Sequence, residues 1–591
     1  MLGHPRGTRR WWRCVGLSCG ILLCVSQGTA WSIFLDKEET LRFNGRVYNR
    51  TSFSTQDAAD NTRLRTPYNS WNMLQNRTFI QMELRHNLTD LITGRSAGFL
   101  APLQYALAPL RLLDPDDIDY FATYRGEYDG VWDYGPDVFS ENFVRNSAGD
   151  KLRTRQRLRH RHRLFEAYVN YTKGPLFLRI GRQNLSWGET DVFRLLDQIN
   201  PLDASFGGFL VALDERRVPL DMLRMVYGLG SRGPFSEVDL EGYVAIDDKV
   251  SDPVPAGSPW ATPNPAGING FVKKPAKNFT DARGGGRILG VLGDFTLSVA
   301  HYYTYLDAPT LRIVTPIKAP GTKPGQSVPE NPPINLGEFQ AALASGQISR
   351  FLVDHFQANV MFPKIQISGA TMSFSVPRFY AVVRSELAYF YAEPFFLNSR
   401  GNQLLGPAIT GRVTPGYKQV GTDPTGKPLL RYKNDIDRSD VVRWSLGIDI
   451  NRYIRFLNPQ QSFLISTQAF GTHILDFDDT SLTEVAPSFG FAHFAVPVRD
   501  PHRNNDAFVN LDPYQIINTL SISTSYRSGV ISPALVFLYD WQGAWLVQPG
   551  ITFIRDPFRL TVQYNYLDGQ FNGIGFLRDR DNVIIQLEFV I

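Results

Sequence analysis

The feature of this 591-residue sequence that most limits its possible folds is an alternation of apolar and polar side chains with a period of two residues. Near the C-terminus the alternation is almost uninterrupted, with apolar side chains at Val583, Ile585, Leu587, Phe589 and Ile591. The same pattern occurs at 443–450 and 559–566. A period of two is that of a β-strand with one apolar face, and about 9–11 residues in such a strand cross a bilayer at a tilt.

The segments that connect these strands alternate in length. Short turns, such as 172–175 and 293–294, alternate with long stretches rich in Pro, Gly and Asp, such as 247–284, 306–363 and 392–439. Outer-membrane barrels have short periplasmic turns and long extracellular loops, whereas a soluble β-sandwich has no reason to alternate in this way. The sequence therefore predicts an all-β chain that forms a single closed antiparallel transmembrane β-barrel of about 16–18 strands with long extracellular loops. The predicted strands are 41–52, 74–88, 117–131, 164–171, 176–184, 222–229, 236–246, 285–292, 295–305, 365–376, 379–391, 441–453, 462–474, 514–527, 529–540, 545–555, 558–567 and 582–591.

The longest loop contains a predicted helix. Asn335 followed by Glu338 is typical of a helix N-terminus, and Leu336, Phe339 and Leu343 would share one face. This helix would either fold into the lumen as a constriction or cover the rim of the barrel.

Composition agrees with a barrel and excludes other classes. Aromatic residues make up 13% of the chain, yet the mean hydropathy is only −0.20, because lipid-facing and lumen-facing positions alternate and cancel. After the N-terminal region no run of about 18 apolar residues occurs, which excludes transmembrane helices. The formal net charge of +4 is too small to indicate nucleic acid as a partner.

The first 30 residues are predicted to be a secretory signal peptide, followed by the barrel at 31–591. A basic region precedes an apolar stretch at about 15–25, and the small residues Gly28 and Ala30 stand where cleavage requires them. All three cysteines, Cys14, Cys19 and Cys24, lie in this segment, so the mature chain would contain none.

Three blocks of the sequence resemble a known family. They are the stretch GRQNLSWGE at 181–189 with NPLD at 200–203, the segment at 444–459, and the segment at 384–390. The chain resembles the bacterial outer-membrane proteins known as domain-of-unknown-function family 1302, and the similarity spans most of the mature sequence. The resemblance implies a barrel in the outer membrane of a Gram-negative bacterium. It also implies transport of envelope lipids or hydrophobic compounds, with an inner-membrane exporter and a periplasmic carrier as partners. The barrel-assembly machinery is a further expected partner, although Ile591 departs from the aromatic last residue that this machinery usually reads.

The alternation of each strand predicts which side chains face the lumen. Charged side chains on the lipid face would cost several kcal/mol near the midplane, so the polar face of each strand is assigned to the interior. In strand 164–171 this assignment places Phe165, Ala167 and Val169 outside. The residues predicted to line the lumen or the substrate path are Glu83, Arg85, Glu166, Arg179, Gln183, Arg384, Glu386, Arg443 and Asp449. A lumen with charges of both signs is either a salt-bridge network that stiffens the wall or an eyelet that orients a polar solute.

Trp187 and Glu189 follow the end of strand 176–184 and complete this predicted path. They would form the mouth of the pore or an inward-folded loop, or Trp187 would pack its loop against the barrel rim.

An unusual run of arginines precedes strand 164–171. Arg153, Arg155, Arg157, Arg159, Arg161 and Arg163 recur at every second residue. In an extended chain they share the face that is predicted to be lipid-directed at Phe165, so they would stand at the level of lipopolysaccharide phosphates, which guanidinium groups bind in a bidentate manner. The alternative is a solvated basic extension of the strand.

The sequence contains none of the common catalytic or phosphate-binding motifs, so we predict neither an enzyme nor a bound cofactor or metal. The first functional hypothesis is a conduit for hydrophobic or lipid-like compounds, passive or working with an inner-membrane exporter. The alternatives are a general polar-solute porin and a structural or adhesive barrel with a plugged lumen. A lateral gap between weakly paired strands would favour the first hypothesis, and an open, water-filled waist would favour the second.

Overall fold

The computed structural model describes residues 33–57, 69–95, 100–136, 158–252, 260, 270–307, 310–314, 333–347, 351, 357–397, 407, 410–413, 417–432, 437–477, 482–483, 513–570 and 573–590. The predicted signal peptide lies outside these residues.

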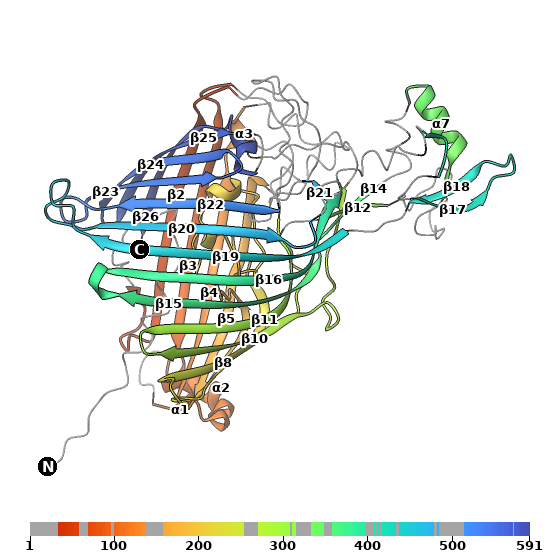
Figure 1. Cartoon of the computed structure of the whole chain (residues 1–591). Helices are drawn as coiled ribbons and strands as arrows, with labels where there is room; N and C mark the ends of the chain where they lie inside the picture. Colours follow the sequence, from red (N-terminus) through yellow and green to blue (C-terminus); the bar gives the residue numbers. More distant parts are fainter. Residues whose placement is uncertain are drawn as a thin grey trace, which may run out of the picture.

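Eighteen of the described strands form one closed antiparallel barrel (Figure 1). Each strand pairs with the next one in this series, and β26 pairs with β2 to close the wall. The strands are β2 (Leu41–Ser54), β3 (Met73–Asn87), β4 (Asp117–Asp129), β5 (His160–Lys173), β6 (Leu176–Gln183), β7 (Leu220–Gly228), β8 (Glu237–Ala245), β10 (Arg283–Leu292), β11 (Phe295–Tyr305), β15 (Lys364–Val376), β16 (Ala381–Leu397), β19 (Asp437–Arg452), β20 (Phe463–Ile474), β22 (Tyr514–Ser523), β23 (Ile531–Asp540), β24 (Ala544–Arg555), β25 (Phe558–Gly569) and β26 (Asn582–Val590). The predicted barrel is confirmed, and every predicted strand overlaps one of these.

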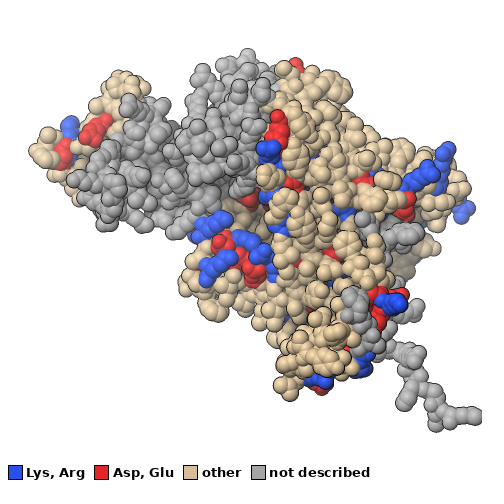
Figure 2. All heavy atoms as spheres, turned by 180° about the vertical axis from the view of Figure 1, so that it is seen from behind, with Lys and Arg blue, Asp and Glu red and all other residues tan. Residues whose placement is uncertain are grey.

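The outer face of the wall is apolar. Ile180, Ile288 and Val299 each expose more than half of their surface, at 58%, 56% and 64%. Most of the described wall seen in Figure 2 carries no charged side chain. Such a surface is unfavourable in water but is the lipid-facing band of a membrane barrel. The chain is therefore a Gram-negative outer-membrane barrel. None of the helices within the described ranges is long and apolar enough to span a membrane.

The two ends of the barrel differ. At one end most connections between strands are short. One longer connection on that side contains α1 (Thr89–Thr93), α2 (Leu103–Leu107) and η2 (Ala108–Leu113) (Figure 1). We call this the periplasmic end and the opposite one the extracellular end. Beyond the extracellular end, β9 (Gly270–Lys273), β12 (Thr310–Val314) and β14 (Gln357–Met361) form a small separate sheet.

The predicted loop helix exists but does not enter the lumen. It is α7 (Leu336–Ala344), and the Asn335 side chain accepts hydrogen bonds from the Gly337 and Glu338 backbone N–H groups, as a capping residue does. The helix packs beside β13 (Ile334–Asn335), β17 (Tyr417–Thr422) and β18 (Pro428–Tyr432) in a unit that projects away from the barrel (Figure 1). The interpretation of this helix as a lumen constriction is therefore wrong.

The barrel wall extends less far toward the extracellular end on the side formed by β6, β7 and β8, because these strands are short. Strand β5 pairs with β4 as far as His160, but its pairing with β6 stops at Ala167 opposite Arg182. Among the described strands, none pairs with the other edge of residues 160–166. The extracellular part of β5 is therefore a free edge, as is the β16 edge at 393–395, which pairs with β19 but not with β15.

Candidate functional site

The segment that links β6 to β7 is the main occupant of the lumen. Gln183 pairs directly with Leu220, so a tight turn could join the two strands. Residues 184–219 instead fold into the barrel, and we call them the lumen segment. They include η3 (Gly208–Leu210) and α6 (Leu213–Arg216). Because the segment carries many apolar side chains, it packs against the inner wall; the most buried are Leu185, Trp187, Phe193, Leu195, Leu196 and Ile199.

The first anchor of the lumen segment is Glu386 on β16. One carboxylate oxygen, Oε1, accepts hydrogen bonds from the backbone N–H groups of Glu189 and of Thr190, the latter at 2.8 Å. The other, Oε2, accepts one from the Leu196 N–H at 3.1 Å. One buried carboxylate thus satisfies three backbone donors of the lumen segment.

Arg384, two residues before Glu386, reinforces this anchor. Its guanidinium contacts the Asp191 carboxylate at 2.5 Å and the Asp449 carboxylate on β19 at 2.8 Å. Gln468 on β20 donates to Asp191 at 2.6 Å. Three neighbouring strands therefore hold one short stretch of the lumen segment.

Apolar contacts cover the same stretch of wall. The Trp187 ring meets the edges of Tyr243 and Tyr302 at centroid distances of 5.3 and 5.6 Å, and Phe193 meets Phe470 at 5.0 Å. Trp187 thus packs an inward-folded loop against the inner wall.

Glycine lets the segment approach β15 closely. A Cβ on Gly369 would lie 2.4 Å from Leu196 Cδ2 and also 2.4 Å from the Leu387 carbonyl oxygen of β16. Any other residue at position 369 would therefore displace the Leu196 side chain and strain the pairing of β15 with β16.

The second anchor is Glu215 of α6. Its carboxylate accepts a hydrogen bond from the Tyr48 hydroxyl at 2.7 Å and forms ion pairs at 3.1–3.7 Å with Arg77, Arg50 and Arg46. Burial alone would raise the pKa of Glu215, but the three guanidinium groups and the Tyr48 hydroxyl more than offset this effect and lower it to about 2. The anchor is therefore ionised at any ordinary pH.

The two anchors stand on opposite walls. Arg77 lies on β3 and Glu386 lies on β16. Around the wall from β3, β16 is the ninth strand reached through β4 and also the ninth strand reached through β2 and β26. A segment fixed to both strands reaches from one wall of the lumen to the opposite one. The lumen segment therefore obstructs the barrel.

A third contact corrects the predicted direction of the arginine run. Arg161 pairs with Asp203 of the lumen segment at 2.6 Å and with Glu127 at 2.8 Å, and Arg163 pairs with Glu127 at 3.1 Å. Both arginines therefore point into the lumen. Phe165 also faces inward, under the Arg125 guanidinium, which lies 3.4 Å from its ring centroid.

The outward prediction for Phe165, Arg161 and Arg163 is wrong because β5 has a bulge. Thr123 pairs with Glu166 and Tyr124 pairs with Leu164, so one extra residue reverses the faces above this point. Arg159 pairs with Asp133 at 2.7 Å. The remaining members of the run, Arg153, Arg155 and Arg157, lie outside the described residues.

The other predicted lumen residues divide into two groups. Trp187, Glu189, Arg384, Glu386 and Asp449 come together at the first anchor. The rest lie elsewhere on the inner wall.

Three of these other residues make local wall contacts. Arg443 pairs with Glu393 at 2.8 Å, and Arg85 pairs with Asp119 at 3.0 Å. Glu83 accepts a hydrogen bond from Gln81.

The remaining three lie beside the start of the lumen segment or nearer the periplasmic end. Glu166 accepts from the Asn184 N–H at 2.9 Å, and Gln183 donates to the Met222 carbonyl at 3.0 Å. Arg179 donates to Asn170 at 2.7 Å.

The residues of the second anchor were not among the predicted ones. Arg46, Arg50 and Arg77 stand on polar strand faces and could have been found by the same alternation. Asp203 belongs to the NPLD block, but Glu215 lies in a stretch without any period, so no local signal marks it.

Comparisons with known proteins place the chain in a family. The solved structures that match include OccAB1 of Acinetobacter baumannii, at 8% identity over 96% of this chain and 99% of that one, with a TM-score of 0.40. OccAB4 of the same organism matches at 7% identity over 93% and 98%, with a TM-score of 0.42. OmpF of Salmonella typhi, in complex with daunomycin, matches at 7% identity over 93% and 97%, with a TM-score of 0.34. No curated protein matches the sequence. The family model described as "Protein of unknown function (DUF1302)" matches residues 11–589, and the chain belongs to this family.

Proposed function

We propose that this chain is an outer-membrane channel for hydrophobic or lipid-like compounds, passive or working with an inner-membrane exporter, and that it exchanges them with the membrane sideways. The observation that carries the proposal is the free edge of β5 at residues 160–166. In a closed ladder a lipid-like molecule cannot leave the lumen through the wall, because every backbone group is paired with the next strand. The free edge of β5 removes this barrier beside β6.

The free edge is closed by side chains rather than by a strand. Arg182, the last residue of β6 that pairs with β5, donates through Nη1 to the Leu164 carbonyl at 3.3 Å. Its Nε donates to Asp221 at 3.0 Å. A rotation of one arginine side chain would expose the edge, whereas opening a paired ladder would break several backbone hydrogen bonds at once.

The lining near the extracellular end supports an apolar cargo. The inward side chains there form one buried apolar cluster with the lumen segment, and they include Tyr243, Tyr302, Ile367, Phe390, Phe470 and Ile474. The lumen of a water-filled porin is polar. Any space uncovered by a shift of the lumen segment would therefore be apolar.

A polar-solute porin is the second candidate, and one observation favours it. The inner face of β2–β5 carries Arg46, Arg50, Arg77, Arg125, Arg161 and Arg163. Such a surface would attract anions, but Glu127, Asp203 and Glu215 occupy most of these guanidinium groups. Neither candidate requires chemistry on the cargo, and we expect no catalytic activity.

Bridging the free edge is expected to stop transport. Leu164 and Arg182 are replaced together by Cys in the mature chain, which otherwise has no cysteine, and a short cleavable thiol cross-linker is added. We expect the flux of a hydrophobic fluorescent dye across the outer membrane of living cells to fall by roughly tenfold, and to recover when the linker is cleaved.

The matched control is the pair Val169→Cys and Ile180→Cys. These residues face each other where β5 and β6 are already paired, so a bridge there should not change the flux. If bridging 164 to 182 leaves dye flux unchanged, the lateral route is wrong. If small hydrophilic solutes rather than the dye depend on the chain, the porin candidate replaces it.

A further inference from the structure

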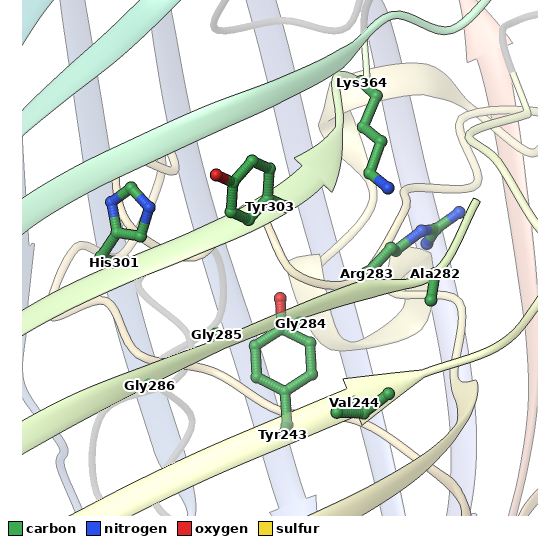
Figure 3. A pocket seen from close by; sticks show the side chains of 10 residues that line it. All are labelled: Tyr243, Val244, Ala282, Arg283, Gly284, Gly285, Gly286, His301, Tyr303 and Lys364. Atoms are coloured by element: carbon green, nitrogen blue, oxygen red, sulfur yellow. The ribbon is translucent and has the colours of Figure 1, made fainter. Parts of the chain in front are cut away.

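A pocket of about 780 Å³ lies in the wall at β8, β10 and β11, apart from the lumen segment (Figure 3). The residues that line it are Tyr243, Val244, Ala282, Arg283, Gly284, Gly285, Gly286, His301, Tyr303 and Lys364. Val244 and Tyr303 are 45% and 42% exposed and stand on the outer face of their strands. The pocket therefore opens toward the membrane.

The floor of the pocket is glycine. Gly286 pairs with Gly242 on one side and His301 on the other, and Gly284 lies between Val244 and Tyr303. A Cβ at Gly286 would meet no side chain, and its nearest neighbour would be the Glu241 carbonyl at 3.4 Å. Missing side chains thus hollow the wall between Val244 and Tyr303, and this part of the hollow is apolar, as a hydrocarbon chain requires.

One end of the pocket carries polar groups that the fold leaves unsatisfied. Arg283 is 2% exposed; its Nη2 donates to the Lys249 carbonyl, but its Nε and Nη1 have no hydrogen-bond partner among the described residues. The Tyr243 hydroxyl, also buried, likewise has none there. Lys364 adds a second cation beside Arg283, and Figure 3 shows both at the same end of the pocket. Unmet buried donors cost about 1–3 kcal/mol each, and an anionic acceptor would relieve that cost.

The position of the pocket indicates where that anion comes from. Along β11 the outward aromatic residues lie at its two ends, Phe295 at the periplasmic end and Tyr303 and Tyr305 at the extracellular end. Aromatic girdles of this kind mark the two membrane interfaces of a barrel. Tyr303 lines the pocket, so the pocket lies at the headgroup level of the outer leaflet.

We infer that this pocket binds lipid A, the phosphorylated lipid of the outer leaflet. An acyl chain lies over Gly284 and Gly286, and a phosphate lies between Lys364 and the free donors of Arg283. Val244 and Tyr303 place the mouth of this site on the outer wall, while Tyr243 in its lining also packs against Trp187 of the lumen segment.

The test is native mass spectrometry of the purified full chain with added lipid A, after confirmation that each variant folds. Lys364→Gln removes a cation, and Gly286→Leu fills the floor without a positive φ to oppose it. Each is expected to lower the bound lipid A by roughly fivefold or more. Val299→Leu adds bulk to the outer face of β11, below the pocket, and should leave binding unchanged.

Several outcomes would overturn the inference. The inference is wrong if Lys364→Gln and Gly286→Leu bind as much lipid A as Val299→Leu does. Equal binding of dephosphorylated lipid A by the natural chain would rule out the phosphate contact and leave only an acyl groove. If Gly286→Leu does not fold, Lys364→Gln alone decides the outcome, because among the described residues the Lys364 side chain makes a single hydrogen bond, an exposed one to the Thr280 carbonyl.

Discussion

Deleting residues 184–219 and joining β6 to β7 with a short Gly/Ser turn is expected to convert an obstructed barrel into an open pore. The strands stay in register because Gln183 already pairs with Leu220, while both anchors and the apolar side chains that fill the extracellular end are lost. A barrel of this strand number without an inward segment has a water-filled lumen. Cells that produce the variant should become more sensitive to a large hydrophilic antibiotic by roughly tenfold or more.

The matched control for this deletion removes a segment outside the barrel. Shortening the β17–β18 hairpin, which projects beyond the extracellular end, should leave antibiotic sensitivity unchanged (Figure 1). Both variants are first shown to be folded by their heat-dependent shift in gel electrophoresis. An unchanged sensitivity in a folded deletion variant would mean that the lumen segment is not what obstructs the barrel.

The second large effect is expected from Glu215→Gln. The change leaves Arg46, Arg50 and Arg77 without their shared counter-charge in a buried site, and such a loss costs about 3–5 kcal/mol. The far end of the lumen segment should then detach without unfolding the barrel. Since 1.4 kcal/mol is a factor of ten, hydrogen exchange at 203–217 should accelerate by roughly a hundredfold or more.

Asp214→Asn is the control for this variant, because it removes a charge from the neighbouring residue of the same helix. The Asp214 side chain is 55% exposed, against 5% for Glu215, so its ion pair with Arg217 contributes only about 0–1 kcal/mol. Exchange in Asp214→Asn should therefore stay near that of the natural chain. Equal exchange rates in both variants would contradict the account of the second anchor.

The same anchor should persist in mild acid. The folded-state pKa of Glu215, about 2, lies below the ordinary value of 4.5. For a carboxylate with a lowered pKa, the contribution to stability is complete above the unfolded-state pKa and is lost as the pH falls through the folded-state value. Exchange at 203–217 measured at pH 5 should therefore match exchange at pH 7 after correction for the intrinsic rate.

The barrel was predictable from the sequence because its signal is local. Each strand carries its own period of two, and a one-residue slip would bring polar groups to the lipid face, so the outward positions of Ile180 and Leu387 follow from the strand alone. The inward placement of Arg384 and Glu386 followed in the same way.

What the sequence did not reveal depends on contacts between distant segments. The bulge at Phe165 is a property of the pairing of β5 with β4, and nothing within 160–173 announces it. The two anchors stand on opposite walls because β3 and β16 are opposite each other. That arrangement is defined only when the barrel has closed with its full number of strands. Glu215 sits in a stretch without periodicity, where only the folded wall shows that three arginines face it.

Single-channel recording of the intact, folded protein in a planar bilayer tests the central claim most directly. The lumen segment crosses from β16 to β3 and is fixed at both ends, so the natural chain should give no steady conductance, while the variant that lacks residues 184–219 should give large, salt-dependent steps. Steady, salt-dependent steps from the natural chain would contradict this account, because they would establish an open aqueous pore and make the polar-solute porin the correct interpretation.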